Sequence, residues 1–253
     1  MTLATLACIK RVPDTGSAIK LTPDAQRIDT TGLGHTMSPH EECAIEEAVS
    51  QADTHGGSAT VLTLGPTDAE EQLRTGIAMQ ADEAILLDAG EEEWDPMATA
   101  EAIATAISEH DREFDLLLFG NESADSEHYQ VGIRVAHHLG LPCVTGIKDI
   151  EINDGVATAK REQPTGAAIF EVDLPAVITV REGINEPRYP SMRAKMQARR
   201  QEIPHISPSG EPGGPQKRRL ITPDEEVSEA EILGEGAEAA SRIVDVFEEL
   251  EVL

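Results

Sequence analysis

The chain of 253 residues carries 47 acidic and 20 basic side chains, a formal net charge of −27. Its 40% hydrophobic content suffices for the core of one large domain, and its 3% aromatic content predicts that this core is aliphatic. The acidic charge argues against nucleic-acid binding, no apolar run reaches the roughly 20 residues of a membrane span, and the first residues lack a signal-peptide pattern. Three well-separated cysteines add the expectation of a reducing cytoplasm.

Short apolar runs that alternate with helical patterns predict an α/β fold. The runs are continuously apolar, which is typical of strands that are buried on both faces. Strands are expected over residues 3–9, 59–64, 84–87, 116–119 and 176–180. Helices are expected to begin at Ser38-Pro39, Thr67 and Asp95-Pro96, and to run from about His128 to Leu139. This alternation predicts a three-layer, doubly wound, mainly parallel sheet of the Rossmann-like type.

The first helix has the clearest start signal. Ser38 is expected to cap it, Pro39 to take its first position and Glu41 to complete a capping box. His40-Glu41-Glu42 and His137-His138 lack the spacing of metal ligands, and we expect both groups on solvated helix faces. Cys8 lies in an apolar strand and is expected in the core.

The alternating pattern breaks at about Ile147. Residues 147–152 and 156–160 flank Asn153-Asp154-Gly155 and predict a β-hairpin, with 167–172 as a third antiparallel strand, so the insertion spans 147–172.

The remainder of the chain predicts a linker and a helical arm. The stretch 207–216 is rich in Gly, Pro and Ser. We therefore divide the chain into an α/β domain (1–205), a linker (206–219) and a C-terminal helical arm (220–253) with helices at 223–233 and 238–253. The last helix carries an apolar stripe that must be covered by this domain or by another chain, formed by Ile243, Val244, Phe247 and Leu250.

Common catalytic and nucleotide motifs are absent from the sequence. There is no P-loop, no G-x-G-x-x-G after the first strand and no C-x-x-C. Ligands of open α/β sheets bind beyond the carboxyl ends of the strands, where the loops 10–16, 65–68 and 120–132 are expected. The last loop leads into a helix through small and polar residues, and backbone amides at a helix start suit a phosphate. An ordinary solvated loop is the alternative.

The charge is uneven in kind and in place. Only 6 of the 20 basic residues are lysine. Excess acid with little lysine favours a halophilic protein, because repulsion is screened beyond about 3 Å in 1 M salt; a mesophilic acidic protein is the alternative. The stretch 181–219 holds nine basic and four acidic residues, a local charge of +5 that leaves −32 for the remainder. Such a stretch predicts a contact surface.

Five segments, in the same order and spacing, resemble the β subunit of electron transfer flavoproteins. They are CIKRVPDT (8–15), MSPHEE (37–42), TGIAMQAD (75–82), the loop from Asp125 to Gln130-Val131-Gly132, and NEPRYPS (185–191). The resemblance implies an adenine-nucleotide-binding α/β domain in a heterodimer with an α subunit, which shares an FAD with it. It also implies electron transfer from flavin dehydrogenases, such as the acyl-CoA dehydrogenases of fatty acid oxidation, to a membrane quinone oxidoreductase. No catalytic residue, metal or direct membrane insertion is implied.

The resemblance also implies the binding residues. The nucleotide would be AMP in ordinary members and a second FAD in electron-bifurcating members. Its site would comprise Ala7, Ser38, Pro39, His40, Glu41, Leu64, Asn121, Ser123, Ala124, Asp125, Ser126, Tyr129, Gln130, Val131 and Gly132. The loop 185–200 would dock on the dehydrogenase through Glu186, Pro187, Arg188, Tyr189, Met192, Lys195 and Met196, with Met192 as the apolar anchor. The C-terminal arm would contact the α subunit.

The sequence departs from the family pattern near the expected phosphate. Asn121-Glu122 stands where Lys-Gln is usual, which removes a cation and adds an acid. AMP and a second FAD therefore both remain candidates. A stand-alone nucleotide-binding regulatory protein is a further alternative, which the NEPRY segment and the terminal helix disfavour. A nucleotide-hydrolysing enzyme is disfavoured because neither a phosphate-activating lysine nor a metal cluster is visible.

Overall fold

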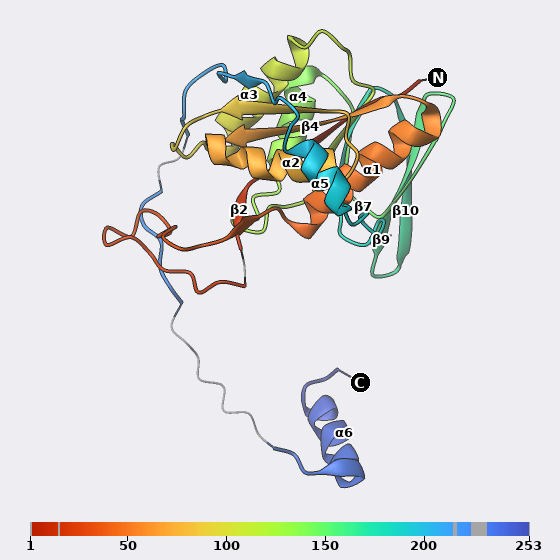
Figure 1. Cartoon of the computed structure of the whole chain (residues 1–253). Coiled ribbons are helices and arrows are strands. Elements are labelled where there is room, and N and C mark those ends of the chain that lie inside the picture. Colours follow the sequence, from red (N-terminus) through yellow and green to blue (C-terminus); the bar gives the residue numbers. More distant parts are fainter. Residues whose placement is uncertain (1, 15, 215–216, 224–231, 253) are drawn as a thin grey trace.

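The computed structural model describes residues 2–14, 16–214, 217–223 and 232–252 (Figure 1). The strands are β1 (Ala4–Ile9), β2 (Val12–Pro13), β3 (His35–Thr36), β4 (Ser58–Gly65), β5 (Glu83–Asp88), β6 (Leu116–Gly120), β7 (Cys143–Ile147), β8 (Asp149–Asn153), β9 (Val156–Gln163), β10 (Gly166–Asp173), β11 (Ala176–Val180) and β12 (His205–Ile206). The helices are α1 (Pro39–His55), the 3-10 turn η1 (Thr67–Ala69), α2 (Glu70–Ala78), α3 (Pro96–Ser108), α4 (Val131–Leu139), α5 (Met192–Ala198), the 3-10 turn η2 (Gly236–Glu238) and α6 (Ala239–Glu249).

A seven-stranded parallel sheet forms the centre of the domain, in the order β12-β5-β4-β1-β6-β11-β7. In the register of this sheet, Ala7 of β1 lies between Val61 of β4 and Leu118 of β6. From β1 the chain builds β4 and β5 on one side and then returns to build β6 on the other. This reversal creates a topological switch point at the carboxyl ends of β1 and β6, where ligands of open sheets bind.

Different helices cover the two faces of the sheet, which confirms the predicted three layers (Figure 1). Successive side chains of a strand point to opposite faces. Ala7 and Ile9 of β1 therefore pack with α1 and α2, whereas Leu6 and Cys8 pack with α3 and α4. The core is aliphatic, as expected, and α5 packs against α2.

The structure corrects the predicted start of the insertion. Ile147, expected to open the hairpin, is the last residue of β7, which pairs in parallel with β11. The sequence of β7 has no continuous apolar run, because it contains Thr145 and Gly146. Gly146 has a φ of +69° and lies beside a shift in the register with β11. The hairpin follows as the antiparallel sheet β8-β9-β10, with the expected Asp154-Gly155 turn.

A long excursion after β2 was not expected. Residues 14 and 16–34 form an excursion between β2 and β3, which pair with each other, and within it Leu21 and Ile28 form an isolated bridge. The predicted linker lies against this excursion, because Gln26 Nε2 donates to the Arg218 carbonyl at 2.7 Å, and the first residue of the predicted arm follows, with the Leu220 backbone N–H donating to the Ala25 carbonyl at 2.7 Å. The edge strand β12 ends one residue beyond the predicted domain boundary.

Helix α6 stands away from the α/β domain in Figure 1. The predicted helix at 223–233 falls almost entirely outside the described residues. Among the described residues, no helix has both the length and the apolar content to cross a lipid bilayer.

Candidate functional site

The loop after β6 lies directly against the start of α1, at the switch point of the sheet. Gly120 ends β6, and a Cβ on it would lie only 2.8 Å from Glu41 Cγ and 3.1 Å from the Glu41 backbone nitrogen. The Ser38 hydroxyl donates to the Glu122 carbonyl at 3.2 Å. The structure thus brings the two expected nucleotide-binding segments, 38–41 and 121–132, into contact.

Ser38 and Glu41 form the predicted capping box. Ser38 Oγ accepts from the Glu41 backbone N–H at 3.3 Å, and Glu41 Oε2 accepts from the Ser38 N–H at 2.8 Å. Glu41 is 5% exposed, so the prediction of a solvated helix face is wrong for it. The helix phase turns this position toward the loop after β6. Burial raises the pKa of Glu41 to about 8, so this carboxyl is mostly protonated at neutral pH.

His40 joins the loop after β6 to the segment that follows β11. Its Nε2 lies 2.9 Å from Glu122 Oε1, and its Nδ1 accepts from the Glu182 backbone N–H at 2.7 Å. Because Nδ1 accepts, the ring proton lies on Nε2 and is donated to the Glu122 carboxylate. The His40 side chain is only 15% exposed, which also contradicts the solvated position expected for it.

Lys10 is a site residue that the sequence analysis did not select. Its Nζ lies 2.6 Å from Asp125 Oδ2 and 3.3 Å from Ser126 Oγ, so it ties the end of β1 to the loop after β6. Burial alone would raise the pKa of Asp125, but the Lys10 charge and hydrogen bonds from Lys10, Ser123 and Ser126 outweigh burial and lower that pKa. A lysine directly after a central strand was the available signal, because that position faces the switch point.

Helix α4 begins at Val131, three residues later than predicted. Glu127 and Tyr129 have φ angles of +46° and +56°, a conformation that interrupts a right-handed helix. The side chain of Gln130, at the N-cap position of α4, makes no capping hydrogen bond with the described residues, so the first amides of α4 remain for a ligand or water.

Two contacts attach the start of α4 and the loop after β6 to the carboxyl ends of β6 and β11. A Cβ on Gly132 would lie 3.1 Å from Phe119 Cγ and from Thr179 Cγ2, so glycine permits this close approach. Thr179 Oγ1 donates to Asn121 Oδ1 at 2.9 Å and accepts from the Gly146 N–H at 3.0 Å. Thr179 is a second supporting residue that sequence analysis missed, since it lies in an apolar strand.

The other predicted residues differ in access. Ala7 is fully buried, so only its backbone could reach a ligand. Leu64 is half-buried, and Tyr129 is 51% exposed. The remaining loop residues Ser123, Ala124, Ser126 and Val131 are half-buried or exposed beside the start of α4.

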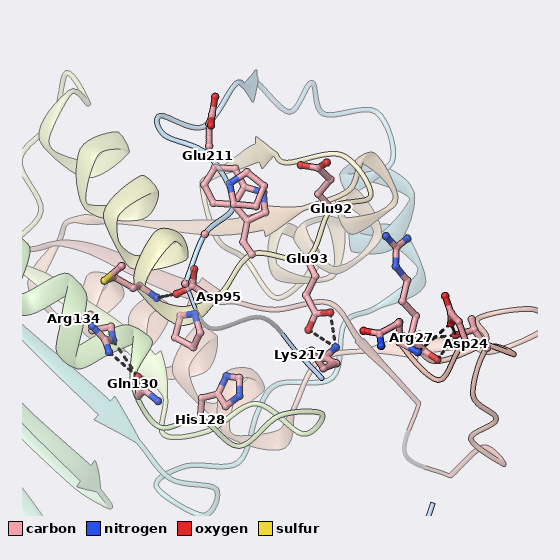
Figure 2. Close-up of a pocket in the computed structure, with 18 residues that line it drawn as sticks. Asp24, Arg27, Glu92, Glu93, Asp95, His128, Gln130, Arg134, Glu211 and Lys217 are labelled. Atoms are coloured by element: carbon pink, nitrogen blue, oxygen red, sulfur yellow. Dashed lines mark hydrogen bonds and ion pairs between the residues drawn. The ribbon is translucent and has the colours of Figure 1, made fainter. Parts of the chain in front are cut away.

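An open cleft of about 1660 Å³ adjoins the end of this loop, and Figure 2 shows the residues that line it. His128, Gln130 and Arg134 line one part of it, and Arg134 donates to Gln130 Oε1 at 3.0 Å. Gln130 is the only predicted nucleotide-binding residue in its lining. Its charges are mixed, with cations from Arg27, Arg134 and Lys217 and acids from Asp24, Glu92, Glu93, Asp95 and Glu211.

The expected docking loop contains the short helix α5, which Ser191 caps by accepting from the Ala194 N–H at 3.2 Å. Tyr189, Met192 and Met196 are 89%, 74% and 56% exposed. Lys195 Nζ lies 4.8 Å from the centre of the Tyr189 ring, a cation–π contact. Glu186 and Pro187 are exposed as well. Arg188 differs, because its guanidinium is bound to Glu46 of α1.

The basic stretch 181–219 does not form one surface. Arg193, Arg199 and Arg200 are exposed on and after α5. Lys217, in contrast, binds Glu93 at 2.5 Å, in the part of the linker that lies beside the excursion and far from α5 (Figure 1). The predicted contact surface is therefore confined to the α5 end of the stretch.

Comparison with known proteins agrees with these segments. The sequence pattern of the electron transfer flavoprotein domain matches residues 27–210. The chain is 34% identical over 235 residues to the electron transfer flavoprotein subunit beta of Megasphaera elsdenii, covering 86% of this chain and 87% of that one. It is 32% identical to the Bacillus subtilis subunit beta, with 94% and 95% covered, and 36% identical to the caffeyl-CoA reductase-Etf complex subunit CarD of Acetobacterium woodii, with 78% and 76% covered. The chain therefore belongs to the electron transfer flavoprotein family, as a beta subunit.

Proposed function

We propose that this beta subunit pairs with an α subunit in the cytoplasm, shares an FAD with it, and relays electrons from flavin dehydrogenases to a membrane quinone oxidoreductase. A bound FAD supplies the redox chemistry, and this chain supplies binding and orientation without a catalytic group of its own. Acyl-CoA dehydrogenases of fatty acid oxidation are the donors that fit the resemblance. The similarity to beta subunits over 94% of the chain carries the proposal.

Co-expression with the α subunit of the same organism tests this pairing. The expected product is a yellow heterodimer with a flavin absorption spectrum. A colourless monomer that never binds the α subunit would instead favour the stand-alone nucleotide-binding regulator.

The same proposal places an adenine nucleotide at the switch point, between the start of α1 and the loop 121–132. The start of α4 fits its phosphate, because the amides there are left free by the described side chains, as noted for Gln130. The amides at the start of α1 are less suited, because the capping box already uses the Glu41 N–H. Lys10 offers a cation at the same edge of the sheet, through its place beside Asp125 and Ser126.

The acidic residues of the site do not oppose this placement. Glu41 is mostly neutral at pH 7 because burial raises its pKa to about 8. The Glu122 carboxylate receives the His40 Nε2–H bond at 2.9 Å. The acid that replaces the usual residue at position 122 is thus held toward α1 by its own partner, which reduces its repulsion of a phosphate.

The cleft beside the loop keeps a second candidate open. His128 and Gln130 line it at the end of the loop, so a second FAD, as in an electron-bifurcating complex, would extend from the loop into this cleft. Denaturing the purified heterodimer and identifying the released nucleotides distinguishes the two. One FAD with one AMP per heterodimer supports simple electron transfer, whereas two FAD molecules support bifurcation.

The α5 surface supports a docking role. Met192 and Met196 expose flexible apolar side chains, and Arg193, Arg199 and Arg200 are exposed on and after the same helix. Flexible methionines suit a surface that accepts several partners. We assign this surface to the dehydrogenase and the apolar face of α6 to the α subunit.

A further inference from the structure

The segment that leads to α5 is bound along α1 in a constant register. The Glu182 backbone N–H donates to His40 Nδ1 at 2.7 Å, Asn185 Nδ2 donates to the Cys43 carbonyl at 3.1 Å, and the Arg188 N–H donates to Glu46 Oε2 at 2.9 Å. Each donor lies 142 residues after its acceptor, so the contacts advance three residues at a time along both segments. Three contacts in one register indicate that the whole segment is bound along α1, and not at a single point.

The last of these contacts is the strongest. Arg188 Nε lies 2.8 Å from Glu46 Oε2 and Nη2 lies 2.9 Å from Glu46 Oε1, which is a two-pronged ion pair in addition to the backbone bond. The Glu46 side chain is 12% exposed and the Arg188 side chain 27% exposed. The remaining Nη1 binds Gln80 at the end of α2 and lies 3.7 Å from Asp53. The hydrogen bonds that Arg188 donates to Glu46, together with the negative charge of Glu46, raise the pKa of Arg188.

Asn185 supplies a second attachment one step earlier. Its Nδ2 also donates to Glu47 Oε2 at 3.0 Å, and Glu47 Oε1 accepts from Gln51 at 2.8 Å. Glu47 is 7% exposed, and burial raises its pKa. Two neighbouring acids of α1, Glu46 and Glu47, thus bind the segment before α5.

The far end of α5 is held as well. Arg74 of α2 donates through Nη1 to the Ala198 carbonyl at 2.7 Å and to the Gln201 carbonyl at 3.0 Å, while Nη2 binds Glu70 at 2.6 Å. A seven-residue helix has too few internal bonds to be stable alone. Its orientation therefore depends on its packing against α2, on the Glu46–Arg188 attachment before it and on the Arg74 attachment after it.

We propose that Glu46, Asn185 and Arg188 are positioning residues for electron transfer, which fix α5 so that Met192 and Met196 meet the dehydrogenase in one orientation. This inference rests on the docking role proposed for α5. Arg188 acts through its contact with α1, and its guanidinium is not part of the contact with the partner. A docking surface that is already held in one orientation loses less conformational entropy when its partner binds, so a loosened α5 should weaken binding of the dehydrogenase.

The test uses the heterodimer with an acyl-CoA dehydrogenase that reduces the wild type. Glu46→Gln and Arg188→Lys should raise the KM for the dehydrogenase about tenfold while kcat at saturation stays within about twofold. The double exchange Glu46→Arg with Arg188→Glu should recover part of the loss. Amide exchange over residues 192–198 should accelerate in both single variants. The matched control is Glu83→Gln, which breaks the Glu83–Arg112 pair (3.0 Å) at the amino end of β5, and it should leave KM unchanged.

The variant Met192→Ala distinguishes the positioning role of Glu46 and Arg188 from the docking role of α5 on which it rests. If Met192→Ala raises KM but Glu46→Gln and Arg188→Lys leave both KM and amide exchange at wild-type values, the positioning role is wrong and the docking role stands. If Met192→Ala also leaves KM unchanged, the docking role itself fails. A loss of kcat with unchanged KM in the Glu46 and Arg188 variants also contradicts positioning of a docking surface.

Discussion

The ammonium of Lys10 lies 2.6 Å from Asp125 Oδ2 and thereby joins the end of β1 to the loop after β6 across the switch point of the sheet. Lys10→Met should weaken retention of the adenine nucleotide by about tenfold or more, since a hydrogen bond to a charged group contributes about 1.5–3 kcal/mol. Nucleotide released on dilution, measured by chromatography, checks this. Arg112→Met, which breaks the pair with Glu83 at the amino end of β5, is the control and should not change release. Equal retention in both variants would refute a role for Lys10.

The buried carboxyl of Glu41 predicts a specific pH dependence of stability. Its pKa is about 8 in the folded chain, against an ordinary value of 4.5, which applies to the unfolded chain. Between these two pH values the folded chain holds a proton that the unfolded chain has lost. The resulting stabilisation is fully present below about pH 4.5 and disappears as the pH rises through 8. Glu41→Gln has no such proton, so its melting temperature relative to the wild type should increase from pH 5 to pH 9. A difference that is constant over this range would contradict the buried, protonated carboxyl.

Met192 is expected to concentrate the binding energy of the docking surface. Met192→Ala should weaken the complex with the dehydrogenase by about 2 kcal/mol, or roughly thirtyfold in affinity, because apolar anchors dominate such interfaces. The flavin spectrum of the heterodimer should not change. Ile169→Ala removes a similarly exposed apolar side chain (67%) from β10 and serves as the control. A slower transfer with Ile169→Ala but not with Met192→Ala would move the docking surface to the antiparallel sheet.

The apolar face of α6 is expected to bind the α subunit. Ile243, Val244 and Phe247 are 40–45% exposed, although they form one stripe of the helix. Phe247→Asp should reduce co-purification with the α subunit, because it places a charge in a desolvated contact. It should leave the melting temperature of the isolated beta subunit within about 1 °C. Asp245→Asn is the matched change on another side of α6. Normal pairing of the Phe247→Asp variant would exclude this face.

The net charge predicts stabilisation by salt. A charge of −27 on one chain repels itself, and salt screens this repulsion. The melting temperature should therefore rise between 0.1 M and 2 M KCl. An unchanged melting temperature over this interval would oppose the halophilic interpretation and favour a mesophilic acidic protein.

The layered fold was predictable because its signals are local. The five expected strands all occur, and Ser38, Pro39 and Glu41 begin α1 as the capping pattern indicates. Strand β7 was not predicted, because Gly146 interrupts its apolar run. The two-residue strand β12 is too short to produce a recognisable pattern.

The partners within the site depend on long-range contacts and could not be read from the sequence. Lys10 and Asp125 are 115 residues apart, and Arg188 and Glu46 are 142 apart. The family resemblance placed Arg188 among the docking residues, yet only the fold shows that its guanidinium turns inward to α1. His40 and Glu41 were expected in solvent because a helix pattern alone does not reveal which loop covers its first turn.

Helix α1 touches both proposed sites, since His40 stands at the nucleotide end and Glu46 holds the approach to α5. The two residues are six positions apart, about 9 Å along one helix. Helix α1 therefore sets the spacing between the proposed nucleotide site and the proposed docking surface. Inserting or deleting a residue between them would rotate one end by about 100° relative to the other. The segment between His40 and Glu46 must therefore keep its length.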